Sequence, residues 1–288
     1  MISWDQSLIN AIARRRCVIV LGAGVSRNST NAKGKRPDTW EDFLKSCVRN
    51  LTDVDHIITL ISQKDFLTAC ELIKERMGVD DFTEKVQQEY QRSGYSHAPI
   101  HEQIYKLDSS IVASPNFDNI YDTYASSESA SSVVIKDHTS SDIANYLLGG
   151  DKRLIIKTHG SANNPTEIIF TRNDYAEART KYVLFYEILK SLALTHTFLF
   201  LGCGTDDPDI RQLFEDLQFT HGRMPYHYMT LPKGEVHNDV LKVASASMRI
   251  RFLEYSPDNE HEELSLSLVD LVTDVEGVRT ELTRNEQW

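Results

Sequence analysis

Cysteine is scarce in this chain of 288 residues, and the four cysteines lie far apart, at positions 17, 47, 70 and 203. No two of them form the C-x-x-C pair of a structural zinc site, and their spacing does not indicate a disulfide framework. The sequence therefore predicts a protein without a bound metal that resides in a reducing cytoplasm.

Basic charge is also in short supply. Lys and Arg number 31 against 42 Asp and Glu, a formal net charge of −11. Proteins that bind nucleic acid usually present a basic face, so this balance argues against direct binding to DNA or RNA. No apolar run approaches the ~20 residues of a membrane span. The N-terminus has Asp5 before its apolar residues and three arginines after them, the reverse of a secretory signal.

The chain does contain short apolar segments that alternate with helical patterns. The first, residues 17–21, is fully apolar, as is typical of a parallel strand buried on both faces. The other expected strands are residues 109–114, 153–158, 167–170, 195–202, 226–231 and 248–255. With one long helix expected over about 174–192, the alternation predicts an α/β fold with a Rossmann-like, doubly wound parallel sheet.

The pattern is interrupted between the first two strands. Residues from about 53 to 107 repeat apolar side chains at helical spacing, which indicates a helical insert lobe. We expect one Rossmann-like domain over residues 1–255 that contains this insert. Residues 256–288 are rich in acidic side chains, and we expect a solvated acidic helix followed by a loose tail, with a subunit contact as the less favoured interpretation.

Four polar or glycine-rich segments follow expected strands, where parallel sheets bind ligands. They are Gly22–Ser26, Asn116–Asp118, Thr158–Gly160 and Gly202–Thr205. Each alone has a simpler explanation as a tight turn or a helix cap. The glycine turn also lacks the third glycine of the dinucleotide fingerprint, because Arg27 stands there, so redox chemistry is not implied.

In combination and in this order, the segments resemble the signatures of the sirtuin family. The G-A-G-x-S turn is intact as Gly22-Ala23-Gly24-Val25-Ser26, and T-Q-N-I-D corresponds to Ser114-Pro115-Asn116-Phe117-Asp118. The family's catalytic histidine matches His159-Gly160, and Gly202-Cys203-Gly204 resembles its later glycine–hydroxyl turn. The resemblance spans roughly residues 10–255.

Two departures narrow the resemblance. The paired C-x-x-C motifs of protein deacetylases are absent, and N-A-K-G-K-R-P-D-T-W-E-D-F at residues 31–43 replaces their G-I-P-D-F-R. The chain is therefore more similar to the sirtuin-like domains of prokaryotic antiphage defence systems. Those domains share an F-L-G…D-P pattern, here Phe200-Leu201-Gly202 and Asp207-Pro208, and typically hydrolyse NAD+.

The resemblance implies NAD+ as the substrate and its nicotinamide–ribose bond as the bond that breaks. Asn116 would order the ribose and the attacking water, and His159 would act as general base. Gly22 and Gly24 would present backbone N–H groups to the pyrophosphate, and Asp118 would accept from the nicotinamide carboxamide. The residues implied to bind NAD+ are Gly22, Ala23, Gly24, Ser26, Asp118, Gly202 and Cys203.

Other functions stay open on the sequence alone. One is a protein deacylase or ADP-ribosyltransferase, although the zinc lobe that would help to build a peptide channel is missing. Another is a non-catalytic nucleotide-binding sensor. An NAD+-depleting enzyme needs restraint, so we expect a homo-oligomer with an activating partner. By analogy with related defence systems, that partner would be a HerA-type ATPase or an Argonaute-like protein.

Overall fold

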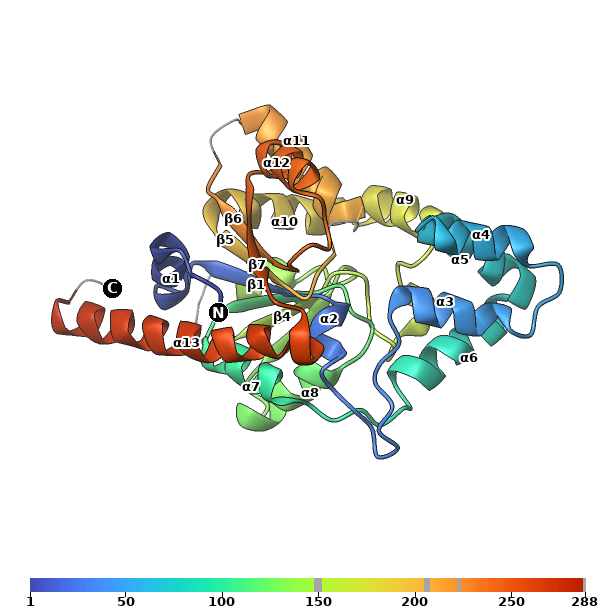
Figure 1. The fold of residues 1–288 in the computed structure, drawn as a ribbon, viewed down its shortest axis with the longest axis horizontal. Helices are drawn as coiled ribbons and strands as arrows, with labels where there is room; N and C mark the ends of the chain where they lie inside the picture. The colour runs from blue at the N-terminus through green and yellow to red at the C-terminus, as the bar shows by residue number, and fades with distance from the viewer. Residues whose placement is uncertain (148–151, 205–207, 222–223, 287–288) are drawn as a thin grey trace.

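Seven parallel strands form the sheet of the computed structural model, which describes residues 1–147, 152–204, 208–221 and 224–286 (Figure 1). The strand order is β3-β4-β2-β1-β5-β6-β7. The strands are β1 (Cys17–Leu21), β2 (Ile111–Ser114), β3 (Val134–Asp137), β4 (Leu154–Lys157), β5 (Thr197–Leu201), β6 (His227–Pro232) and β7 (Ile250–Tyr255). The predicted α/β fold with a Rossmann-like, doubly wound parallel sheet is confirmed.

Side chains of β1 alternate between two hydrophobic layers. Cys17, Ile19 and Leu21 face one layer, and Val18 and Val20 face the other. The first layer is completed by α1 (Gln6–Ala13), α7 (Pro99–Lys106), α8 (Ile120–Glu128) and α13 (Asp258–Arg284), and the second by α10 (Val183–Thr195), α11 (Pro208–His221) and α12 (Asn238–Met248). Because helices cover both faces, the central strand β1 is apolar and buried at every position.

A helical lobe stands beside the sheet, on the right of Figure 1. It consists of α3 (Trp40–Val48), α4 (Asp55–Ser62), α5 (Phe66–Met77) and α6 (Val79–Tyr90), which share one hydrophobic cluster. The range expected as a helical insert is helical, but its last helix, α7, packs on α13 and α8 at the sheet. Conversely, α3 precedes the expected insert and packs with α4 and α5.

Two expectations about local structure were wrong. Residues 167–170 form no strand: the short 3-10 helix η2 (Pro165–Glu167) leads into an extended segment. Its apolar side chains are buried against helices rather than in the sheet. The long helix expected over about 174–192 is two helices, α9 (Arg172–Lys181) and α10, separated at Tyr182.

The sequence analysis also missed β3, an edge strand that leads to the 3-10 helix η1 (Ile143–Tyr146). None of its four residues is fully buried, and only the first two, Val134 and Ile135, are apolar.

The C-terminal helix α13 is longer and better packed than expected. Leu264, Leu268, Leu271 and Val275 are buried against the layer that contains α1 and α7. The helix was predicted correctly, but its solvated character was wrong, because helical spacing places these side chains on one face. Arg279 strengthens the contact by donating from Nη2 to the Leu107 carbonyl oxygen over 2.8 Å.

Candidate functional site

A cavity of about 490 Å³ opens beyond the carboxyl ends of the central strands, within the range of small-molecule sites. The chain passes from β1 to β2 on one side and later crosses to β5 on the other, so the cavity lies at the topological switch point. Most of the sequence-predicted site residues line it, namely Gly22, Ala23, Ser26, Asn116, Asp118, His159, Gly202 and Cys203. Gly24 is the one predicted residue that is not among the lining residues.

The glycine turn after β1 packs directly on the turn after β5. The N–H groups of Gly22 and Gly24 donate to the carbonyl oxygens of Leu201 and Gly202, each over 2.9 Å. A Cβ on Gly24 would lie 2.9 Å from the Gly202 Cα. These two glycines therefore allow two backbones to meet, and their N–H groups are already used. The next backbone N–H group to consider is that of Ala23, which is the first residue of the one-turn helix α2 (Ala23–Ser26) and lines the cavity.

Arg27 occupies the position of the missing third glycine and ties the turn to the helical lobe. Its Nη1 donates to Asp42 Oδ2 over 2.9 Å and to the Pro37 carbonyl oxygen over 3.5 Å. Asp42 also closes the capping box of Thr39 at the start of α3. The arginine thus connects the end of α2 with the first turn of α3.

Three polar side chains from two strand ends are joined by hydrogen bonds. Asn116 Nδ2 donates to Ser26 Oγ over 3.0 Å, and Ser26 Oγ donates to Asp118 Oδ2 over 2.8 Å. Ser26 and Asp118 are each only 5% exposed. The sequence brings these residues to one point because β1 and β2 are neighbouring parallel strands that end at the same edge of the sheet.

His159 follows β4 and lies at the wall of the same cavity. Its Nδ1 is 3.4 Å from the hydroxyl of Tyr175, and its backbone oxygen accepts from Ile169 N over 3.0 Å. The next residue, Gly160, has φ +82°, and a Cβ there would lie 2.9 Å from the Glu167 carbonyl oxygen. Backbone contacts on both sides therefore hold the imidazole beside the cavity.

A buried ion pair supports the loop that carries Asn116 and Asp118. Lys157, at the end of β4, donates from Nζ to the Asp118 carbonyl oxygen over 2.6 Å and lies 3.3 Å from Asp122 Oδ2. Burial raises the pKa of Asp122, and the charge of Lys157 opposes this rise. The sequence analysis did not single out Lys157, because a lysine at the end of an apolar strand gives no signal of its own.

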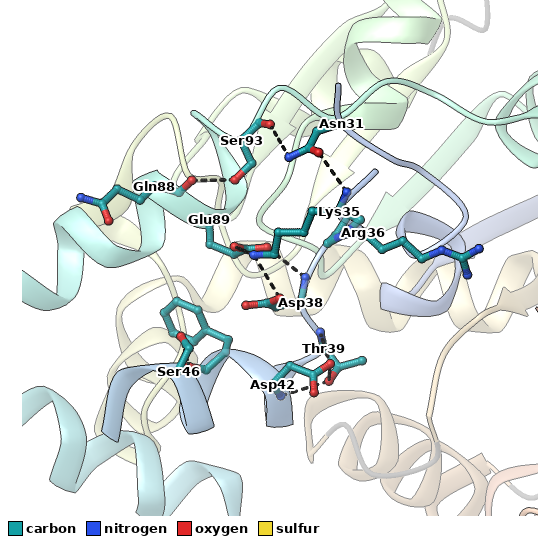
Figure 2. Close-up of polar contacts among 12 residues, drawn as sticks. Asn31, Lys35, Arg36, Asp38, Thr39, Asp42, Ser46, Gln88, Glu89 and Ser93 are labelled. Carbon is teal, nitrogen blue, oxygen red and sulfur yellow. Dashed lines mark hydrogen bonds and ion pairs between the residues drawn. The ribbon is translucent and has the colours of Figure 1, made fainter. Parts of the chain in front are cut away.

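The loop before α3 forms one rim of the cavity and is anchored by Glu89 of α6. Figure 2 shows the Glu89 carboxylate directed toward Lys35 and Asp38. Glu89 Oε1 accepts from Asp38 N over 3.0 Å and from the Tyr95 hydroxyl over 2.6 Å, while Oε2 pairs with Lys35 Nζ. Burial, and next the charge of Glu89, raise the pKa of Asp38, which lines the cavity.

An aromatic wall that the sequence analysis missed closes the cavity on the side of the lobe. Trp40 stacks on Phe170 with ring centroids 5.5 Å apart and lies 5.4 Å from Phe66. Phe117, between the two polar residues of the loop after β2, meets Phe170 edge-on at 4.8 Å. The wall adds apolar surface for a planar ring to the cavity that Asn116, Ser26 and Asp118 also line.

The described part of the chain can be compared with the expectations about a metal site, a membrane span and the F-L-G…D-P pattern. There, no group of three or more His, Cys, Asp or Glu side chains could hold a metal ion. Across the same residues, no helix is both long and apolar enough to cross a membrane. Asp207 of the predicted F-L-G…D-P pattern lies outside the described residues, and Pro208 begins α11.

The comparison with known families agrees with this geometry. The family model of the SIR2-like domain matches residues 110–253, half of the chain, and that range contains Asn116, His159 and Gly202. The chain belongs to the SIR2-like family. The resemblance drawn from the sequence motifs is confirmed.

Curated relatives of this SIR2-like chain come from bacteria. It is 25% identical over 158 residues to "Defense-associated sirtuin 2" of Bacillus subtilis, and this aligned segment covers 53% of the chain and 15% of that relative. It is 36% identical over 67 residues to "NAD(+) hydrolase ThsA" of Enterococcus faecium, covering 23% and 14%. It is 24% identical over 208 residues to "NAD(+) hydrolase ThsA" of Acinetobacter baumannii, covering 70% and 39%. The chain thus spans well under half the length of these relatives.

Proposed function

We propose that this SIR2-like chain hydrolyses NAD+ to nicotinamide and ADP-ribose as the NAD+-depleting effector of an antiphage defence system. The observation that carries the proposal is the cavity at the β1/β5 switch point, which brings Asn116, His159 and the glycine turns together. Two relatives named NAD(+) hydrolase support the reaction, and one named defense-associated sirtuin supports the role in defence.

The proposed reaction needs no group beyond the chain, its substrate and water. Water attacks C1′ of the nicotinamide ribose while the C1′–N bond breaks, and the electron pair of that bond neutralises the pyridinium nitrogen. The proton of the attacking water passes to His159, since an imidazole suits proton transfer near neutral pH. The transition state has oxocarbenium character, which a nearby amide oxygen of Asn116 would stabilise.

The remaining site residues would bind the dinucleotide. The Ala23 N–H, at the first position of α2 and beside the cavity, is suited to contact the pyrophosphate. Gly22, Gly24, Gly202 and Cys203 would shape that end of the site by holding the two turns together. The aromatic wall of Trp40 and Phe170 would face a planar ring of the substrate.

The NAD+-cleaving activity would be restrained in the free chain and triggered when the chain assembles with other subunits. The chain would act in the cytoplasm, where the NAD+ pool lies, as a homo-oligomer activated by a partner such as a HerA-type ATPase. We propose the lobe of α3–α6 as the helical insert, because it supplies one wall of the cavity and its helices share one hydrophobic cluster, which also takes in Phe117 and Phe170. Activation would deplete NAD+ and arrest the infected cell.

The test is to incubate the protein with NAD+ over a wide range of protein concentrations and quantify the products, with and without an acylated peptide. We expect equal amounts of nicotinamide and ADP-ribose and no effect of the peptide. Nicotinamide released only with the peptide, together with an acylated ADP-ribose, would show a deacylase instead. No release at any concentration, together with an unchanged NAD+ level in phage-infected bacteria that express the chain with its activating partner, would contradict the proposal.

A further inference from the structure

We infer that Lys157 is a positioning residue that fixes the loop after β2 against the loop after β4 and so sets the placement of Asn116 relative to His159. The inference deepens the proposed function and rests on it for the kinetic consequences. Its geometry rests on the hydrogen bonds and the ion pair that Lys157 and its neighbours make inside the protein.

The loops that follow β2 and β4 run side by side because the two strands are neighbours in the sheet. Ser114, the last residue of β2, is paired with Lys157, the last residue of β4. Beyond that pair, the Ala162 N–H donates to the Phe117 carbonyl oxygen over 2.9 Å. The two loops that carry the proposed catalytic residues are therefore joined to each other, and a contact between them affects both sides of the reacting bond.

Lys157 reaches the loop after β2 from inside the protein. Its side chain is 2% exposed, and its Nζ donates to the Asp118 carbonyl oxygen over 2.6 Å. A hydrogen bond from a charged donor is roughly twice as strong as one between neutral groups. The described residues that line the cavity do not include Lys157. Its effect on the reaction therefore passes through the loop and not through the substrate.

The Asp118 carbonyl group ties the conformation of this loop to Lys157. A buried carbonyl oxygen that loses its donor costs free energy, so the peptide after Asp118 would turn toward water if the amine were removed. That peptide lies within three residues of Asn116, and the side chains of Asn116 and Asp118 both line the cavity. Rotation of the peptide would move both side chains away from the positions that the fold gives them.

Asp122 has a different relation to Lys157, because it supplies a counter-charge and not a link between the loops. Its Oδ2 lies 3.3 Å from Lys157 Nζ, and the residue is 4% exposed. A buried charge that loses its partner is strongly destabilising, whereas a buried pair replaced by neutral groups of similar size often costs little. Charge pairing with Asp122 and donation to Asp118 are therefore two separable roles of one amine.

The test compares Lys157→Met, Asp122→Asn and the double variant by thermal unfolding. Each single substitution should lower Tm by about 10 °C, because it leaves one buried charge without its partner. The double variant should recover most of that loss, since both positions are then neutral. A double variant no more stable than Lys157→Met would overturn the separation of the two roles.

Nicotinamide release by the same variants should follow the lysine alone. Asp122→Asn should keep kcat near the wild-type value, because Lys157 still donates to the Asp118 carbonyl oxygen whether or not it keeps its charge. The double variant should lose about 10- to 100-fold in kcat despite its recovered stability, the scale for a misplaced catalytic group. Turnover by the double variant near the wild-type rate would overturn the inference, because a merely structural lysine predicts that activity returns with stability.

The matched control is the double variant Lys136→Met, Asp142→Asn. Lys136 lies in the neighbouring strand β3, and its Nζ is 2.7 Å from Asp142 Oδ2. This pair is more exposed than that of Lys157 and Asp122. Its removal should leave kcat unchanged, and an equal loss of kcat in the control would overturn the assignment to Lys157.

A second measurement does not depend on activity. Deuterium exchange of the substrate-free protein is followed in peptides that cover residues 115–122. Exchange should be faster by about 10-fold or more in the double variant of Lys157 and Asp122 than in Asp122→Asn, the factor for losing a hydrogen bond to a charged donor. Equal exchange in the two variants overturns the inference even if NAD+ is hydrolysed. Faster exchange, in a chain whose wild type fails the NAD+ test, leaves the positioning role standing and refutes the proposed function instead.

Discussion

The contact between the two glycine turns leads to a quantitative prediction for Gly22→Ala. Gly22 has φ −84°, which suits any residue, so the effect of a methyl group there is purely steric. The methyl carbon would lie 2.6 Å from the Cys203 Cα and closer still to the Gly202 carbonyl oxygen. Ordinary carbon contacts begin near 3.5 Å, so the two turns must separate by about 1 Å.

That separation has a cost in stability and in activity. Overpacking costs about 1–3 kcal/mol, and weakening the hydrogen bond from Gly22 N to Leu201 O adds about 1 kcal/mol. We therefore expect the free energy of unfolding to fall by about 2–4 kcal/mol and Tm to fall by about 5–10 °C. Because Gly22 and Gly202 line the cavity, a shift of about 1 Å should reduce NAD+ turnover on the order of 100-fold.

Gly277→Ala in α13 is the matched control. A methyl there meets nothing within 4 Å, and alanine favours a helix over glycine by about 0.5–1 kcal/mol. This variant should be slightly more stable than the wild type and equally active. Thermal unfolding and nicotinamide release are measured side by side for both variants. A Gly22→Ala protein with wild-type Tm and turnover would refute the close contact between the turns.

Three further predictions concern the rim, a buried histidine and metal. Glu89→Gln should lower the free energy of unfolding by about 1–2 kcal/mol, because a neutral amide cannot form the ion pair with Lys35. The control Glu84→Gln, on the exposed side of the same helix, should change it by less than about 0.5 kcal/mol. Equal effects of the two substitutions in urea unfolding would contradict the anchoring role of Glu89. Burial lowers the pKa of His101 to about 4, and its Nδ1 accepts from Ala98 N over 3.0 Å, so between these pH values the unfolded chain binds a proton that the folded chain does not. The contribution of neutral His101 to the free energy of unfolding should be complete above pH ~6.5 and be lost as the pH falls toward ~4. In His101→Gln this loss should be smaller by up to about 3 kcal/mol, and an unchanged pH profile of unfolding would disprove this. The purified protein should contain no stoichiometric zinc and lose no activity in EDTA, so elemental analysis that finds one zinc per chain would count against the account.

The central sheet could be predicted because its strands are buried on both faces and are therefore apolar runs. The same reasoning failed where apolar residues are buried by other means, as in residues 167–170, which pack on helices instead of joining the sheet. It also missed the edge strand Val134–Asp137, in which only the first two residues are apolar and none is fully buried. For α13, the spacing of Leu264, Leu268 and Leu271 did carry the signal of a buried face, which the many acidic residues obscured.

Much of the candidate site could be predicted because each of its segments directly follows a strand. The sequence could not show which groups face each other across the fold. Arg27 and Asp42, Glu89 and Lys35, and Trp40 and Phe170 meet only because helices and turns distant in sequence pack together.

The most direct test of the account compares NAD+ cleavage by the wild type with that of Asn116→Ala and His159→Ala, each checked for an unchanged thermal unfolding curve. Both side chains line the cavity from different strand ends, so each is expected to be needed for bond cleavage while the fold remains intact. The account predicts that the wild type releases nicotinamide and ADP-ribose in equal amounts and that each variant releases neither. Turnover near the wild-type rate in either variant would contradict the assignment of the cavity as the site where the nicotinamide–ribose bond breaks.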